Sequence, residues 1–343
     1  MTKIAEGPWV LVVGMHRSGT SAVTGALGAM GLEPVQPGAR MDWPESNPEH
    51  WESLSLTLFN DEILARLGGS WDGPPDLVEG WEDSPDLEQV GDPLALISSA
   101  YPGGGPSVWK DPRLCILLPF WKKHLSAPLA AVFVWRAPLA VAQSLRQRDG
   151  MSLADGFALW ERYNRTALAN LEGIDTYVAN YEDVVDDPSA FTHQLAAWLS
   201  TIGQFRDIDF ARRLDHGGSS ISDELRHQTG AAEEGGDTFD SPQQRALLGQ
   251  LSDLAGGHRP LPPQPRITEF PWSSAIIGLR RQLSFLHREI DPVREELGRT
   301  KQELADANRN LANLHASTSW RMTKPLRTVI SSLENVRHRP AED

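Results

Sequence analysis

The chain has 343 residues, 40% of them hydrophobic and 23% charged, which excludes wholesale disorder and predicts one large domain with appendages. Its formal net charge of −14 excludes a general basic surface of the kind that wraps nucleic acid. No run approaches the roughly 18 apolar residues of a membrane-spanning helix, the start of the chain lacks the order of a signal peptide, and Cys115 is the single cysteine. A reducing cytoplasm is the expected location.

Short apolar runs separated by helical patterns indicate an α/β fold. The expected strands are residues 9–13, 107–110, 129–135 and 176–181, and helical patterns follow the first and third of them. Another helical segment is expected near 54–67. Strands that alternate with helices predict a parallel sheet with helices on both faces, and ligands of such sheets gather at the carboxyl ends of the strands.

The last quarter of the chain has a different character. Residues 258–275 contain enough proline to predict a stiff linker. The expected division is therefore a domain over 1–257, the linker, an amphipathic or coiled-coil helix over 276–315 and a basic tail over 316–343.

Apolar residues recur at alternating steps of four and three from Leu279 to Leu314, which is the spacing of a coiled-coil seam, with Thr300 as its polar member. Asp291 followed by Pro292 predicts either a kink or a fresh helix start inside this segment. The seam is open to two interpretations: a helix that folds back on its own domain, or self-association or pairing with a glycosyltransferase. The 12 basic and 9 acidic residues from Ile276 onward also leave open a peripheral contact with the anionic inner face of a membrane.

The strongest motif is GMHRSGTS at residues 14–21, between the first expected strand and a helix. Glycines allow successive N–H groups to point at one anion, and a helix start adds its positive end. Arg17 and the neighbouring hydroxyl groups supply further donors. The motif predicts a cradle for a phosphate-type group, the alternative being a glycine turn that merely joins strand to helix.

The type of cradle depends on one position. A nucleoside-triphosphate loop has the pattern GxxxxGK[ST], in which the lysine contacts the terminal phosphates. Gly14 and Gly19 have that spacing, but Thr20 stands where the lysine would be. ATP hydrolysis is therefore disfavoured.

These residues resemble a known family, the sulfotransferases that use 3′-phosphoadenosine 5′-phosphosulfate (PAPS), and particularly the bacterial and Golgi-type branch that acts on glycans. Members carry a basic residue followed by Ser-Gly-Thr after the first strand, which matches residues 17–20. The resemblance also takes in NPEHWES, WKDPRLCILLPFW and YEDVVDDP, from residue 8 to about 230, and leaves out the tail. It implies a P-loop-like parallel sheet with the sulfotransferase fold, and PAPS as co-substrate. The implied cofactor-binding residues of the loop are His16, Arg17, Ser18, Gly19, Thr20 and Ser21.

A second cofactor motif is VFVWRAPLAVAQSL, in which a strand ends at Arg136 and Ser144 follows eight residues later. In the family this pair clasps the 3′-phosphate. Independently of the family, an arginine at a strand end and a serine in the next helix can converge on one dianionic phosphate. The alternative is an arginine that closes a strand and a serine on a solvated helix face.

Sulfuryl transfer needs a base for the acceptor hydroxyl and cations for the charge that passes to the leaving phosphate. Arg17 is placed to be such a cation. The resemblance implies Glu52 as the base, because members carry an acidic residue in a stretch like NPEHWE, with Glu49 and His50 as competitors. The alternative is that these glutamates complement the start of a helix that follows Asn47 and Pro48.

The resemblance implies further site residues. Lys110 would act at the bridging oxygen as a catalytic cation, and Asp111 with Arg113 would order the acceptor, although an Asp-Pro-Arg turn with an internal ion pair would look the same. Trp51 is assigned to substrate binding and Arg226 to the cofactor from a late loop. No spacing of His, Cys, Asp or Glu indicates a metal site, and a leaving nucleotide stabilised by arginines requires none.

The expected function is sulfuryl transfer from PAPS to a glycan or glycolipid hydroxyl. Aromatic and acidic residues between residues 38 and 105 suit sugar rings, and residues 317–327 are similar to short segments beside glycosyltransferase domains of surface-polysaccharide proteins. Two alternatives stay open: a kinase-like nucleotide phosphotransferase on the same type of sheet, and a non-catalytic assembly subunit that acts through the heptad segment.

Overall fold

The computed structural model describes residues 7–41, 51–125, 128–210, 212–213 and 241–329. Its centre is a five-stranded sheet in the order β2-β1-β3-β4-β5. The strands are β1 (Trp9–Val13), β2 (Ser107–Lys110), β3 (Leu129–Trp135), β4 (Asp175–Asn180) and β5 (Gly256–His258). The first four are parallel to one another, and β5 pairs with β4 in the antiparallel direction. The predicted α/β class is confirmed.

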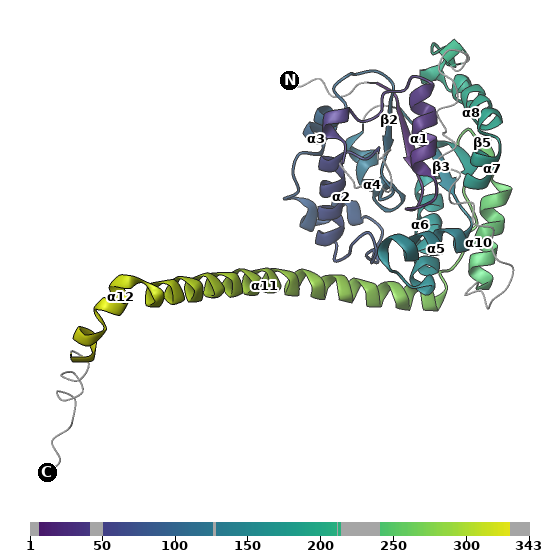
Figure 1. Cartoon of the computed structure of the whole chain (residues 1–343). Helices are drawn as coiled ribbons and strands as arrows, with labels where there is room; N and C mark the ends of the chain where they lie inside the picture. Colours follow the sequence, from purple (N-terminus) through teal and green to yellow (C-terminus); the bar gives the residue numbers. More distant parts are fainter. Residues whose placement is uncertain (1–6, 42–50, 126–127, 211, 214–240, 330–343) are drawn as a thin grey trace. The chain divides into compact units, whose positions relative to one another are not determined.

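Helices connect the strands and cover the sheet (Figure 1). The α-helices are α1 (Thr20–Ala29), α2 (Leu54–Arg66), α3 (Pro93–Ala100), α4 (Leu114–His124), α5 (Pro138–Asp149), α6 (Leu153–Leu171), α7 (Tyr181–Asp186), α8 (Pro188–Thr201), α10 (Pro242–Asp253), α11 (Pro271–Ala316) and α12 (Thr318–Met322). Four short 3₁₀ helices among the described residues are η1 (Pro37–Ala39), η2 (Trp81–Asp83), η3 (Pro85–Leu87) and η4 (Gly203–Phe205).

The alternation of side chains along β1 divides the core into two layers. Leu11 and Val13 belong to the cluster that includes α2, α4 and α6, whereas Val10 and Val12 belong to the cluster that includes α1 and α8. All four side chains are fully buried. A strand that is buried on both faces is continuously apolar, and this property allowed residues 9–13 to be predicted as a parallel strand.

The antiparallel edge strand β5 has no signal in the sequence. Its residues are Gly-Gly-His, which have little strand preference. A Cβ atom on Gly257 would lie 2.0 Å from Cδ1 of Trp198, so the close approach of this side chain requires glycine there.

The prediction that residues 258–275 form a linker outside the α/β domain is wrong, because these residues pack onto that domain. Leu261 is fully buried, and its N–H donates to the carbonyl of Ile174 across 2.9 Å. The N–H of Phe270 donates to Glu161 Oε1 across 2.7 Å. The compact units are Met1–Ser284 and Phe285–Asp343, so the division falls inside α11. Proline content indicates stiffness and says nothing about burial.

The predicted C-terminal helix is present as α11, which continues through Pro292. The fresh helix start proposed at Asp291 is therefore wrong, since a single interior proline removes one backbone donor without necessarily ending a helix. Within the described residues, none of the helices has the length and apolar character to cross a membrane.

Candidate functional site

Parallel strands end at one edge of a sheet, and four segments with polar or charged residues meet there. Lys110 is the last residue of β2, the loop 14–19 follows β1, Arg136 follows β3 and Tyr181 follows β4. The order β2-β1-β3-β4 makes these segments neighbours. The carboxyl edge of this sheet is therefore the candidate site, in line with where open α/β sheets bind ligands.

The loop after β1 has a conformation that depends on its glycines. Gly19 has φ 88° and Arg17 has φ 69°, both in the left-handed region. A Cβ atom on Gly19 would lie 1.9 Å from the ring of Tyr181, and one on Gly14 would lie 2.4 Å from the carbonyl oxygen of Val134. Gly14 thus permits the loop to pack closely against β3, and Gly19 permits it to pack against the start of α7.

The two motifs assigned to the cofactor meet in space. Nε of Arg17 in the loop donates a hydrogen bond to Oγ of Ser144 in α5, across 2.7 Å. Ser144 is buried, and the sequence separation of the two residues is 127. The alternative of a serine on a solvated helix face is therefore wrong, since Ser144 points toward the loop that follows β1.

Arg136 belongs to the same cluster of cations. It is buried, its Cζ lies 4.6 Å from the centre of the Tyr181 ring, and its Nε lies 3.7 Å from Glu182 Oε1. Burial, followed by the nearby charges of Arg148 and Arg136, lowers the pKa of Arg17. Cations that disfavour one another's charge in a buried place form a site with affinity for an anion.

Tyr181 links the two arginines. Burial raises the pKa of its phenol, whereas the charges of Arg136 and Arg17 act in the opposite direction. The ring therefore lies within electrostatic reach of both guanidinium groups.

The contact between Arg17 and Ser144 bears on how a nucleotide could be held. The sequence assigns Arg17 to the 5′-phosphosulfate and Ser144 to the 3′-phosphate, which lie on different sides of the ribose. A guanidinium has five N–H donors and a hydroxyl can donate while it accepts, so this hydrogen bond does not prevent either side chain from contacting a phosphate. The structure places the two assigned donors side by side.

The residues assigned to transfer chemistry also meet. Lys110 Nζ forms an ion pair with Glu52 Oε1 and donates to Oγ of Ser21 across 3.3 Å. Glu52 and Lys110 are both buried. The pair joins the segment before α2 to the end of β2, and Ser21 connects it with the first turn of α1.

Glu52 does not complement a helix start. The helix α2 begins at Leu54, and the N-cap is Ser53, whose Oγ accepts from the N–H of Leu56 across 3.4 Å. Glu52 precedes the cap, and its side chain turns to Lys110. That alternative is wrong for this residue. Glu49, His50 and Asn47 lie outside the described residues.

Asp111 and Arg113 belong to a buried network of hydrogen bonds. Asp111 accepts from Asn60 Nδ2 across 2.8 Å and from Arg113 Nη1 across 3.2 Å, while Arg113 forms a bidentate pair with Asp61 at 2.6 and 2.8 Å. Trp121 Nε1 donates to the Asn60 side chain across 2.9 Å. The nearby carboxylates raise the pKa of Arg113 despite its burial. This geometry matches the structural alternative, a turn with an internal ion pair, and ordering of an acceptor stays a prediction.

His16 packs inward from the loop. Its ring centre lies 4.6 Å from that of Trp71, and its Nε2 is buried without a hydrogen-bond partner among the described residues. Burial, followed by the charges of Arg113 and Arg148, holds the pKa of His16 well below its ordinary value. A neutral imidazole here shapes the loop more readily than it binds an anion, so its assignment to the cofactor has no support from this geometry.

Two other assigned residues of the loop, Ser18 and Thr20, are buried. Ser18 Oγ has no hydrogen-bond partner within the described part of the chain. A buried hydroxyl of this kind is costly unless something satisfies it. Together with the cations, it fits a ligand that offers anionic oxygen atoms.

Trp51 and Arg226 are the remaining residues assigned to the site. Trp51 lies beside Glu52, and its ring is 4.0 Å from Cζ of Arg40. Arg226 lies outside the described residues. Among the residues that the structure describes, no group of three or more His, Cys, Asp or Glu side chains could hold a metal ion.

Sequence reasoning missed two neighbours of the site. Arg148 follows Ser144 by four residues on α5, so helical spacing could have placed both on one face. Tyr181 stands in the quoted YEDVVDDP but received no role. Trp71 is one of the aromatic residues between 38 and 105 that were expected to suit sugar rings, and the fold places its ring 5.5 Å from Cζ of Arg148.

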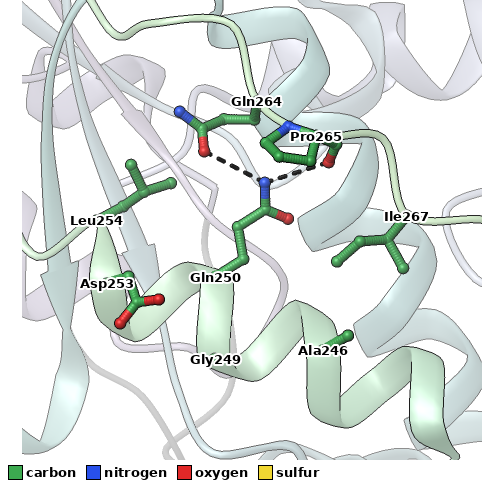
Figure 2. Close-up of a pocket in the computed structure, with 8 residues that line it drawn as sticks. All are labelled: Ala246, Gly249, Gln250, Asp253, Leu254, Gln264, Pro265 and Ile267. Carbon is green, nitrogen blue, oxygen red and sulfur yellow. Dashed lines mark hydrogen bonds between the residues drawn. The ribbon is translucent and has the colours of Figure 1, made fainter.

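A groove of ≈ 410 Å³ lies apart from these residues, between α10 and the segment 264–267. Figure 2 shows Gln250 at its centre, with Nε2 donating to Gln264 Oε1 across 3.2 Å and to the carbonyl of Pro265 across 3.3 Å. None of the residues assigned to the site lines it.

A comparison with solved structures finds a similarity of low TM-score. The sulfotransferase domain from the olefin synthase of Synechococcus PCC 7002 is 17% identical to this chain and aligns with a TM-score of 0.33, over 80% of this chain and 94% of that one. No model of a protein family matches, and no curated protein matches.

Proposed function

We propose that this protein transfers a sulfuryl group from PAPS to an acceptor hydroxyl and releases adenosine 3′,5′-bisphosphate. The observation that carries the proposal is the hydrogen bond from Arg17 to Ser144, with Arg136 beside them. It unites two motifs that resemble the 5′- and 3′-phosphate sites of sulfotransferases, at the sheet edge where ligands of this fold class bind. The function rests on these residues and their resemblance.

The residues of the site fit an adenosine carrying two anionic groups. Arg17, Ser18 and Thr20 would hold the 5′-phosphosulfate, and Arg136 with Ser144 would hold the 3′-phosphate. Guanidinium groups suit this task, because they form bidentate, charge-assisted hydrogen bonds with phosphate oxygens. The donor supplies the sulfuryl group and the leaving phosphate, and the chain supplies the cations and the base.

The pair of Glu52 and Lys110 supplies the chemistry of the transfer. Within the ion pair Glu52 is a carboxylate, which is the form that accepts a proton. Glu52 removes the proton of the acceptor hydroxyl while the oxygen of that hydroxyl forms a bond to sulfur. At the same time the bond from sulfur to the bridging oxygen of the donor breaks. The electron pair of that bond remains on the phosphate, where Lys110 and Arg17 stabilise the charge.

The acceptor is proposed to be a glycan or glycolipid hydroxyl in the cytoplasm or at the inner face of the membrane. Trp51 adjoins the base, and Trp71 lies beside His16 of the loop. Aromatic rings next to polar groups suit the mixed surface of a sugar ring. Polysaccharide biosynthesis is the corresponding process.

Calorimetric titration with adenosine 3′,5′-bisphosphate tests the proposal. The wild-type chain is expected to bind one nucleotide, and Arg136→Ala is expected to weaken its binding about 100-fold. Arg146→Ala is the matched control, because this arginine is exposed on the same helix α5. Titration with ATP and Mg²⁺ distinguishes the kinase-like alternative: tight binding and turnover of ATP, with no heat from the bisphosphate, would contradict the proposal.

A further inference from the structure

The helix α11 carries a long apolar seam that is exposed. The seam itself contains nine large apolar side chains between Leu279 and Leu314, and their exposed fractions run from 41% at Ile290 to 63% at Val293. Exposed apolar stripes of this length are unusual on soluble proteins and mark surfaces that another molecule covers.

The charges beside the seam are segregated by position. In a repeat written a to g, Leu283 takes position a, so Ile290, Leu297, Leu304 and Leu311 are also at a. The g positions, which precede each a, hold Gln282, Glu289, Glu296, Glu303 and Asn310. The e positions, which follow each d, hold Arg280, His287, Arg294, Lys301, Asn308 and His315. One flank of the seam is therefore acidic and the other flank is basic.

We infer that α11 pairs with α11 of a second copy of this chain, as a parallel, in-register, two-stranded coiled coil. In a parallel pair each g residue faces the e residue five positions later on the other helix. Glu289 then faces Arg294 of the second copy, and Glu296 faces Lys301. Both ion pairs occur twice because the pair is symmetric.

The opposite orientation is disfavoured by the same residues. In an antiparallel pair g faces g and e faces e, which would set glutamates against glutamates and basic residues against basic residues. Like charges at such positions are destabilising. The segregated charges therefore favour a parallel arrangement.

The width of the seam indicates two strands. The e and g positions carry no apolar residue from Arg280 to His315, and Phe285 at c is the one large apolar side chain of this segment outside a and d. A stripe confined to these positions is the narrow seam that one partner helix covers.

The residues that break the pattern are compatible with this register. Thr300 is the polar residue at d, and in register it faces Thr300 of the second copy, whereas a shift by one heptad would bury it against Val293 or Ala307. Pro292 and Gly298 fall at c and b on the outer face, away from the partner. Arg294 also pairs with Asp291 across 3.3 Å, but exposed pairs of this kind contribute little.

A charge-reversal series in the full-length chain tests the orientation by sedimentation at micromolar concentration. The wild-type chain is expected to be a dimer. Glu289→Lys with Glu296→Lys makes both flanks basic and is expected to raise the dissociation constant about tenfold or more. Adding Arg294→Glu and Lys301→Glu exchanges the flanks and is expected to restore the dimer.

The control is Glu295→Lys with Asp306→Lys, which changes the net charge equally on the outer face and should leave the dimer intact. In an antiparallel pair the first charge reversal would replace repulsion between glutamates by repulsion between lysines. The dissociation constant of the dimer would then stay nearly unchanged. A dimer that is unaffected by reversal, a monomeric wild-type chain, or a mass of three or more chains would each overturn the inference.

Disulfide cross-linking tests the register separately. Ile290→Cys and Leu311→Cys, each made alone, are expected to form covalent dimers under oxidation, since a faces a in a parallel pair. Gln302→Cys, on the outer face, is the control and should stay uncrosslinked; the native Cys115 is buried. In an antiparallel pair a faces d, so cross-links that form only when Ile290→Cys is mixed with Ala307→Cys would show that orientation and overturn the inference. All these readouts are independent of nucleotide binding and sulfuryl transfer.

Discussion

Nε of Arg17 donates a hydrogen bond to Oγ of Ser144 across 2.7 Å. One residue belongs to the loop after β1 and the other to the helix after β3, so the hydrogen bond spans the centre of the sheet's carboxyl edge. This hydrogen bond brings together the two sequence motifs that were predicted to bind phosphate-type groups.

Ser144→Ala removes the hydroxyl group that Arg17 contacts and that we assign to the 3′-phosphate. Affinity for adenosine 3′,5′-bisphosphate is expected to fall about tenfold, the effect of one hydrogen bond to a charged group. Calorimetric titration measures it, with the exposed neighbour Gln143→Ala as control. Equal affinities of the serine and alanine forms would remove Ser144 from the site.

Glu182→Gln removes a carboxylate that lies 3.7 Å from Arg136 and would compete with a phosphate. Affinity for the bisphosphate nucleotide is expected to rise about threefold, since the Glu182 side chain is 41% exposed and its 3.7 Å ion pair is long, which makes the competition weak. The exposed Asp183→Asn on the same helix serves as the control. Weaker binding after the Glu182 change would contradict the assignment of Arg136 to a phosphate.

Glu52→Gln keeps a hydrogen-bonding side chain beside Lys110 but removes the base. The rate of labelled sulfate transfer from PAPS onto the cell's own glycans is expected to fall about 10²- to 10⁴-fold, while affinity for the bisphosphate nucleotide is retained. The control is Glu62→Gln, an exposed glutamate of α2. An unchanged transfer rate would point to another base, such as Glu49 or His50.

The buried His16 predicts a pH dependence of stability. Burial holds the pKa of His16 in the folded chain well below the ordinary value of 6.5, which applies when the chain unfolds. The unfolded chain therefore binds more protons below pH 6.5, and the free energy of unfolding falls as the pH decreases. His16→Gln should remove a slope of up to about 1.4 kcal/mol per pH unit below pH 6.5. Denaturant unfolding of both proteins between pH 7.5 and 5 measures the difference, and parallel curves would contradict it.

Local patterns allowed much of this fold to be predicted. The runs 9–13, 107–110 and 129–135 match β1, β2 and β3 because buried parallel strands are continuously apolar. The strand β5 could not be predicted, since Gly257 is there to admit Trp198, a contact that no local pattern encodes.

The candidate site also has features that local sequence patterns predict and features that only the fold creates. Its loop and strand-end motifs were visible because each lies within a few residues of sequence. The ion pair of Glu52 with Lys110 joins residues 58 positions apart, and only the order of strands brings them together. The network of Asp111 and Arg113 with Asn60 and Asp61 likewise depends on how α2 packs beside β2.

If one site binds both phosphates of the nucleotide, a cycle of titrations reveals the contribution of each phosphate. The wild-type chain and Arg136→Ala are each titrated with adenosine 3′,5′-bisphosphate and with adenosine 5′-monophosphate. The wild-type chain should bind the bisphosphate about 100-fold more tightly than the monophosphate, a gap equivalent to roughly 2.7 kcal/mol, and this preference should disappear in Arg136→Ala. Equal affinities of the wild-type chain for the two nucleotides, or a preference that persists without the Arg136 guanidinium, would contradict the account.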